Sequence, residues 1–437
     1  MEPYLKQCAV LNDEIEYIEV IDRRYHINSV RADFFLPYTA ENLRSMMLLS
    51  DVFPFGDPLC NTKRSEMRWA KAHYDPTVEM TVSDMGDHLM LSMHCAWLDD
   101  ACALDGESVT DEVLSHLRTL LFAPECADGG CAAPEFDDIR DIAANNMEYE
   151  ERDPMARFKN RINSICYRGE PSATSFHIPP AEMRRITRQD VYSMHMKMLR
   201  EAQIRIAVTL AAENPAVLSW MQTQFGVLER RTVPLVIESP SHIRKQPEVV
   251  REQYEDLTQS LVALVYKYGD VSIKEADYVC ELLDGTTESL LFQNLREKRS
   301  LCYSCECELE HEKHTVTVTC QTDAQHIDEV TALIQEQMAL IRSGSFPESL
   351  DTAIRNALTM QRVDNWDQSL GYSSYVQYRR LMGLSVQKTY EDYMHFETVS
   401  RGTAMKTAEK MILDTVYIAE GLASADGEEA ADDAADI

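Results

Sequence analysis

The order of predicted elements repeats once along this chain, and this repeat limits the fold more than any other feature of the sequence. Both halves contain two amphipathic helices joined by a short loop, followed by another matching segment. The corresponding pairs are 111–121 with 328–338, 139–147 with 353–360, and 162–169 with 375–383. Each half then closes with a helix and a strand, and the two helices begin at the predicted N-caps Thr187 and Ser400.

The two halves also begin alike. A strand is predicted over 29–36 before a helix over 41–52, and a strand over 260–268 before a helix over 274–283. Between the halves, residues 231–253 contain three prolines and few apolar side chains, which is typical of a connector.

We therefore predict an α+β protein with two similar domains, each a mostly antiparallel sheet with helices packed on one face. The N-terminal domain is expected over residues 1–230, the connector over 231–253 and the C-terminal domain over 254–422. Residues 423–437 place six acids among alanines, a composition that predicts a disordered acidic tail.

Charge and cysteine usage narrow the possible partners and the compartment. A formal net charge of −31 argues against nucleic acid or an anionic membrane as a partner, and would attract a basic peptide. The sequence has no apolar run long enough for a membrane helix and no signal-peptide pattern at its start. Twelve cysteines without regular spacing predict reduced thiols and a cytoplasmic location.

The candidate functional residues of the second half, an arginine and a tyrosine, lie in one short segment. Residues 290–303 read LLFQNLREKRSLCY, and Arg296 and Tyr303 stand seven positions apart. If the helix persists, seven residues are close to two turns, so both side chains would share a face.

This segment, the closing sequence LDTVYIAEG at 413–421 and the doubled α+β order resemble the M16 metallopeptidases, the insulinase and mitochondrial-processing-peptidase relatives. The resemblance is strongest to M16B-type subunits that lack the zinc motif, such as the bacterial subunits associated with elongation factor P aminopentanol modification. It implies two half-shells that close around an extended peptide. One shell supplies zinc through His-x-x-Glu-His and a downstream glutamate. The other supplies an arginine that holds a substrate carbonyl and a tyrosine that donates to the oxyanion, here Arg296 and Tyr303.

The first half departs from the family pattern. Its helix over 41–52 reads ENLRSMMLLSDV, and no two of the twelve histidines in the chain stand four apart. Glu148, Glu150 and Glu151 offer carboxylates downstream, but one carboxylate does not hold zinc alone, and a solvated helix face explains them better. We expect no metal or cofactor in this chain, with zinc in a partner subunit.

A second constellation, Cys302, Cys305 and Cys307 followed by His311 and His314, has the residue types of a zinc site. The alternation of Tyr303, Cys305, Cys307 and Leu309 instead favours one face of a strand, with the thiols packed in a core.

The sequence thus predicts a non-catalytic, substrate-binding subunit of a heterodimeric M16B zinc peptidase, inactive by itself. The alternative is a structural or peptide-binding scaffold that has left proteolysis altogether, and a zinc-binding module is a third possibility.

Overall fold

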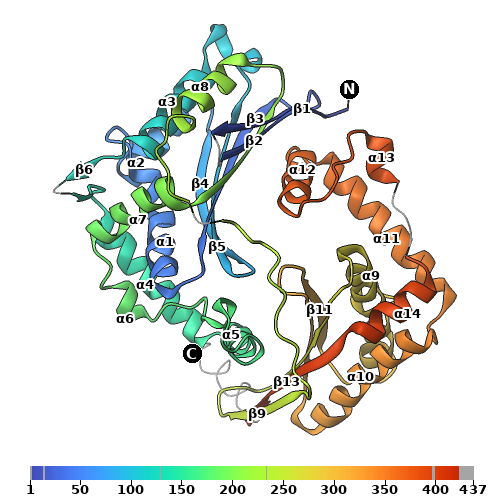
Figure 1. The fold of residues 1–437 in the computed structure, drawn as a ribbon. Helices are drawn as coiled ribbons and strands as arrows, with labels where there is room; N and C mark the ends of the chain where they lie inside the picture. The colour runs from blue at the N-terminus through green and yellow to red at the C-terminus, as the bar shows by residue number, and fades with distance from the viewer. Residues whose placement is uncertain (1, 13–14, 128, 233, 396–398, 423–437) are drawn as a thin grey trace, which may run out of the picture. The chain divides into compact units, whose positions relative to one another are not determined.

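The computed structural model describes residues 2–12, 15–127, 129–232, 234–395 and 399–422, and it contains two large sheets (Figure 1). The acidic tail predicted over 423–437 lies outside the described residues. The first sheet contains, in spatial order, β1 (Tyr4–Asn12), β2 (Ile15–Ile21), β8 (Gln203–Leu210), β3 (Ile27–Pro37), β5 (His88–Leu98) and β4 (Thr77–Met85). The second contains β11 (Ser304–Glu310), β12 (Thr315–Thr322), β10 (Ser260–Lys267), β13 (Ile412–Gly421) and β9 (Glu248–Tyr254).

The sheets share a pairing pattern. In each sheet one pair is parallel, β2 with β8 and β9 with β13, and the other paired strands are antiparallel. The predicted α+β class with two similar, mostly antiparallel sheets is therefore confirmed. The predicted caps are also confirmed, because the side chains of Thr187 and Ser400 accept hydrogen bonds from the backbone N–H groups of Asp190 and Thr403.

Helices bury one face of each sheet in a large apolar core. The helices of the N-terminal half are α1 (Ala40–Val52), α2 (Lys63–Ala72), α3 (Val109–Phe122), α4 (Phe136–Arg152), α5 (Pro154–Cys166), α6 (Pro180–Met183), α7 (Arg188–Glu201) and α8 (Pro215–Phe225). Those of the C-terminal half are α9 (Ile273–Asp284), α10 (Ile327–Ser343), α11 (Glu348–Asp367), α12 (Gly371–Leu381), α13 (Tyr390–Met394) and α14 (Arg401–Lys410). On β10, for example, the alternate residues Val262, Leu264 and Tyr266 lie on one face of the sheet and pack against helices of the C-terminal half.

The opposite face of each sheet is covered by a helix from the other half of the chain. Leu261, Ala263 and Val265 of β10 pack in a separate cluster with Phe158 and Ile162 of α5. This arrangement explains why β10 reads as an almost unbroken apolar run, because both of its faces are buried. The helices are therefore not confined to the single face that the sequence predicts.

The first sheet receives the reciprocal helix. Val376 of α12 is buried in a cluster with Ile18 and Val20 of β2 and Ala207 of β8. The side-chain amide of Gln377 also donates to the Asp33 carboxylate on β3, 2.7 Å away in a buried position. A satisfied buried hydrogen bond fixes α12 in one register on the sheet, because leaving either group unpaired costs free energy.

These exchanged helices divide the chain into units that are not continuous in sequence. Among the described residues, one compact unit contains those of 2–152, 174–237 and 362–395, and the other contains those of 153–173, 238–361 and 399–422. The predicted connector over 231–253 also contains most of β9, an edge strand with alternating exposure that pairs in parallel with β13. The charged residues of β9 made this segment resemble a connector in the sequence, because the strand is stabilised by its pairing with β13. No helix in the described ranges combines the length and apolar character needed to cross a lipid bilayer.

Candidate substrate-binding site

Helix α1 stands where the resemblance places a zinc-binding helix, and its side chains serve the core instead. Leu43, Met46 and Leu49 recur at intervals of three and are buried in the first apolar cluster. Met46 is fully buried, so the middle of this helix contributes a thioether to packing. A histidine in that position would have to displace core volume.

The downstream carboxylates on α4 contact basic side chains. Glu148 accepts from the Arg184 guanidinium at 2.6 Å. The His177 ring lies 3.5 Å from Glu150 and 3.2 Å from Glu151. Glu150 and Glu151 are exposed and Glu148 is half-buried, which agrees with the predicted solvated helix face.

The segment that carries Arg296 is a wide helical turn rather than an extended α-helix. Residues Phe292–Glu297 form a π-helix, and Ser300 then takes a left-handed conformation with φ of 52°. The premise that one helix persists to Tyr303 is therefore wrong, since the chain turns at Ser300 and enters β11 at Ser304. A serine tolerates this strained conformation only where its surroundings enforce it.

The surroundings of this turn are rigid. Leu291, Leu295 and Leu301 are buried in the second apolar cluster, and the N–H of Leu301 donates to the carbonyl of Leu295 at 3.0 Å. The side-chain amide of Asn294 donates to Gln337 of α10 at 2.6 Å. The turn between Arg296 and Tyr303 is thus fixed at both ends by core packing and hydrogen bonds.

Arg296 and Tyr303 are both exposed on this fixed backbone. The Arg296 guanidinium lies 5.2 Å from the centre of the Phe292 ring. Burial raises the pKa of the Cys302 thiol, and the charge of Arg296 opposes that shift. Tyr303 follows directly, is 56% exposed, and its backbone N–H donates to the carbonyl of Gln321 at 2.9 Å. Its hydroxyl lies 3.4 Å from the Asp323 carboxylate, a long and weak contact.

The cysteine and histidine constellation does not gather into one site. Cys305 forms a disulfide with Cys320, the residue directly opposite on β12, and this pair departs from the predicted reduced state. His311 lies 3.1 Å from Asp277, and His314 lies 2.5 Å from Glu238. Cys305, Cys307 and Leu309 pack against the second apolar cluster, as the alternation predicts.

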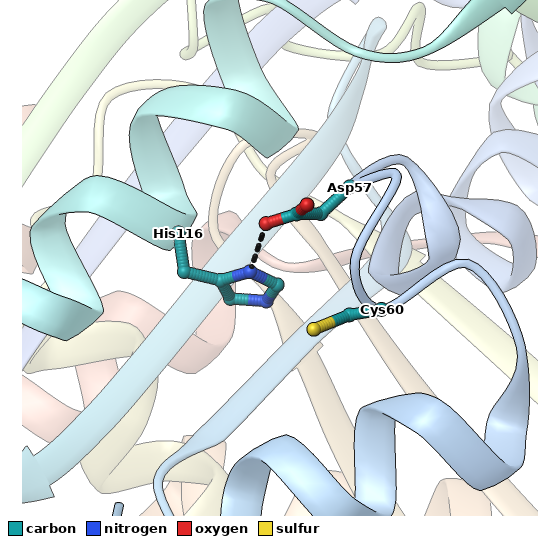
Figure 2. Close-up of side chains that lie close together, drawn as sticks. All are labelled: Asp57, Cys60 and His116. Carbon is teal, nitrogen blue, oxygen red and sulfur yellow. Dashed lines mark hydrogen bonds and ion pairs between the residues drawn. The ribbon is translucent and has the colours of Figure 1, made fainter.

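Residues that the sequence did not single out meet elsewhere, in the N-terminal unit. Asp57 and Cys60 lie between Phe55 and α2, and His116 lies on α3 (Figure 2). The sequence shows that Asp57 and Cys60 are close along the chain. His116 is more than fifty residues away, so only the fold shows that it lies beside them.

Comparison with known proteins finds a family match for part of this chain and a relative of similar length. Residues 185–358 match the Peptidase M16 inactive domain. The M16 resemblance is confirmed. A relative described as the probable inactive metalloprotease YmfF of Bacillus subtilis (strain 168) is 22% identical over 360 residues, covering 80% of this chain and 82% of that protein.

Solved structures show that the fold is shared. A conserved protein from Enterococcus faecalis V583 superposes with a TM-score of 0.84 at 20% identity, over 95% of this chain and 98% of that one. A mutant of the ferredoxin protease FusC, solved in complex with Arabidopsis ferredoxin, has a TM-score of 0.67 at 12% identity. That match covers 97% of this chain and 46% of the FusC chain. The fold of these structures therefore spans this chain and about half of the FusC chain.

Proposed function

We propose that this chain is the non-catalytic, substrate-binding subunit of a paired M16 peptidase. A partner chain would supply His-x-x-Glu-His and zinc, and this chain would supply Arg296 and Tyr303. The observation that carries the proposal is the exposure of Tyr303, 56% of whose surface faces solvent although its backbone is fixed between a buried turn and a sheet. A tyrosine retained for packing would bury its ring, whereas this one presents a ring and a weakly held hydroxyl.

The need for a partner is supported by the residues of helix α1. Helix α1 offers buried Leu43, Met46 and Leu49 where zinc ligands would be required.

The proposed roles follow from peptide-bond chemistry. Zinc in the partner would activate a water molecule for attack on the scissile carbonyl. The Tyr303 hydroxyl would donate a hydrogen bond to the oxygen on which negative charge develops. The Arg296 guanidinium would hold a neighbouring peptide carbonyl in the ground state, because its several N–H donors suit a carbonyl oxygen.

Co-purification tests the proposal. We expect the tagged chain, drawn from its source cells, to elute with a protein of similar length that carries His-x-x-Glu-His, identified by mass spectrometry. A mixed peptide library read by mass spectrometry should be cleaved only by the pair, and chelator should stop the cleavage. The isolated chain should cleave nothing. Chelator-sensitive cleavage by the repurified chain alone would refute the proposal, and the absence of a zinc-bearing partner would favour the scaffold function that its inactive relatives suggest.

Replacing Arg296 should impair binding and turnover together. In the reconstituted pair, Arg296→Ala should raise KM and lower kcat, each by about tenfold, since one charge-assisted hydrogen bond contributes about 1.5–3 kcal/mol. Arg299→Ala is the matched control. It removes an exposed arginine three residues away that lies 3.5 Å from Glu329, and it should leave both constants unchanged. Equal constants in Arg296→Ala and the parent pair would remove Arg296 from the substrate site.

A further inference from the structure

Three side chains with metal-binding atoms meet in the N-terminal unit, whereas the segment proposed to hold substrate belongs to the other unit. Asp57, Cys60 and His116 are all buried, and one ligand atom from each lies within 4.8 Å of those of the other two. Figure 2 shows that Asp57 and Cys60 come from one segment, while His116 reaches them from α3. Within the ranges that the structure describes, they are the one set of three such side chains that converges this closely.

Local hydrogen bonds hold the segment in a turn. The N–H of Cys60 donates to the carbonyl of Asp57 at 2.8 Å, and the N–H of Leu59 donates to Oδ1 of Asp57 at 2.9 Å. The second carboxylate oxygen, Oδ2, lies 2.8 Å from Nδ1 of His116. These contacts fix the carboxylate and the imidazole before any ligand arrives, which reduces the entropy lost on binding.

A catalytic relay is a poor explanation of this cluster. Cys60 is fully buried, and burial raises the pKa of its thiol to about 12, with Asp57 and Glu66 adding to the shift. A nucleophilic cysteine instead needs a lowered pKa and access to substrate. Burial also lowers the pKa of His116, although the hydrogen bond to Asp57 opposes this shift.

We propose that Asp57, Cys60 and His116 form a binding site for Zn²⁺ or a similar borderline-soft divalent cation. Thiolate, imidazole and carboxylate are zinc ligands. The Cys60 thiol would release its proton to solvent on binding, and the resulting thiolate with the Asp57 carboxylate would balance both charges of the ion inside the protein. Ligands of tetrahedral zinc lie roughly 3.3–3.8 Å apart, as follows from metal–ligand distances of about 2.0–2.3 Å. The three atoms here lie within 4.8 Å, so small side-chain movements would close the site.

The surroundings provide packing on one side and access on the other. The Trp69 ring of α2 covers the His116 imidazole, with ring centres 4.1 Å apart. Leu59, adjacent to Cys60, is 82% exposed, so opening of this short turn would admit an ion. The three donors leave one tetrahedral position for a water molecule, as in zinc sites that are not closed by a fourth side chain.

Metal titration of the full chain tests the site. After chelator treatment and gel filtration, the chain should take up one Zn²⁺, counted by inductively coupled plasma mass spectrometry. Co²⁺ should produce visible tetrahedral absorption and a near-ultraviolet thiolate-to-metal band. Cys60→Ser should abolish that band, and Cys60→Ser and His116→Gln should each weaken zinc binding beyond the 10–100-fold typical of losing an outer partner of a ligand.

The matched control is Cys95→Ser, which alters a fully buried cysteine on β5 outside this cluster and should retain both metal binding and the thiolate band. Absence of uptake by the parent chain would overturn the proposal without reference to any variant. Unchanged binding in folded Cys60→Ser and His116→Gln, verified by circular dichroism, would also overturn it. These measurements need neither partner nor peptide, so their outcome is independent of the proposed peptidase role.

Discussion

Tyr303→Phe should lower the turnover of the reconstituted pair by about two to three orders of magnitude, the usual effect of losing one oxyanion donor. The substitution removes one hydroxyl and keeps the ring. Because the oxyanion exists only in the transition state, KM for a cleaved peptide should change little. Stopped assays of peptide cleavage over a range of concentrations give both constants.

We expect the loss of turnover in Tyr303→Phe to arise without a loss of folding stability. Tyr303 is exposed, and its hydroxyl makes one long contact with Asp323, so its loss should change the free energy of unfolding by less than about 0.5 kcal/mol. Tyr149→Phe is the control, because it removes the hydroxyl of another exposed tyrosine, on α4, and should leave kcat unchanged. Full turnover in Tyr303→Phe, with the pair intact in sedimentation, would leave this chain with a scaffold role.

The largest effect on stability is expected at Asp414, a fully buried carboxylate on β13. It lies 3.2 Å from the ammonium of Lys267, which is also buried, and it accepts from the backbone N–H of Arg244 at 2.8 Å and from the Arg244 guanidinium. Asp414→Asn would leave Lys267 without its counter-charge inside the protein. Breaking one side of a buried ion pair costs about 3–5 kcal/mol, so the urea unfolding midpoint should fall markedly.

A second acid on the same strand is the control. Glu420 pairs with Arg251, which is 40% exposed, so Glu420→Gln should cost less than about 1 kcal/mol. Similar unfolding midpoints for Asp414→Asn and Glu420→Gln would show that the buried network contributes little.

The same network predicts a pH dependence of stability. Burial raises the pKa of Asp414, but the Arg244 N–H, the Lys267 charge and the Thr415 hydroxyl lower it more, so its net pKa lies below the ordinary value. A lowered folded-state pKa means that this stabilisation is present above about pH 4, the ordinary aspartate value, and is lost as pH falls through the folded-state pKa. Acid unfolding followed by circular dichroism should show a shallower decline in Asp414→Asn than in the parent chain.

The sequence alone determined the doubled α+β fold, because its evidence is local. Strand β10 is an almost unbroken apolar run, Thr187 and Ser400 are good N-caps, and the helices have amphipathic spacing. The departure from the zinc motif was equally local, since the residues of α1 are read directly. The conformation between Arg296 and Tyr303 could not be predicted from local sequence, because the turn at Ser300 depends on the packing of Leu295 and Leu301.

Only the tertiary structure decided which segments meet. The sequence showed that 162–169 and 375–383 correspond, but not that α5 packs on the second sheet and α12 on the first. A helix's apolar spacing specifies that one face is buried, without specifying the sheet that buries it. Tertiary packing likewise brings Asp57 and Cys60 together with His116. Side-chain periodicity carries information over a few turns, whereas contacts between distant segments are selected by the combined packing of the whole core.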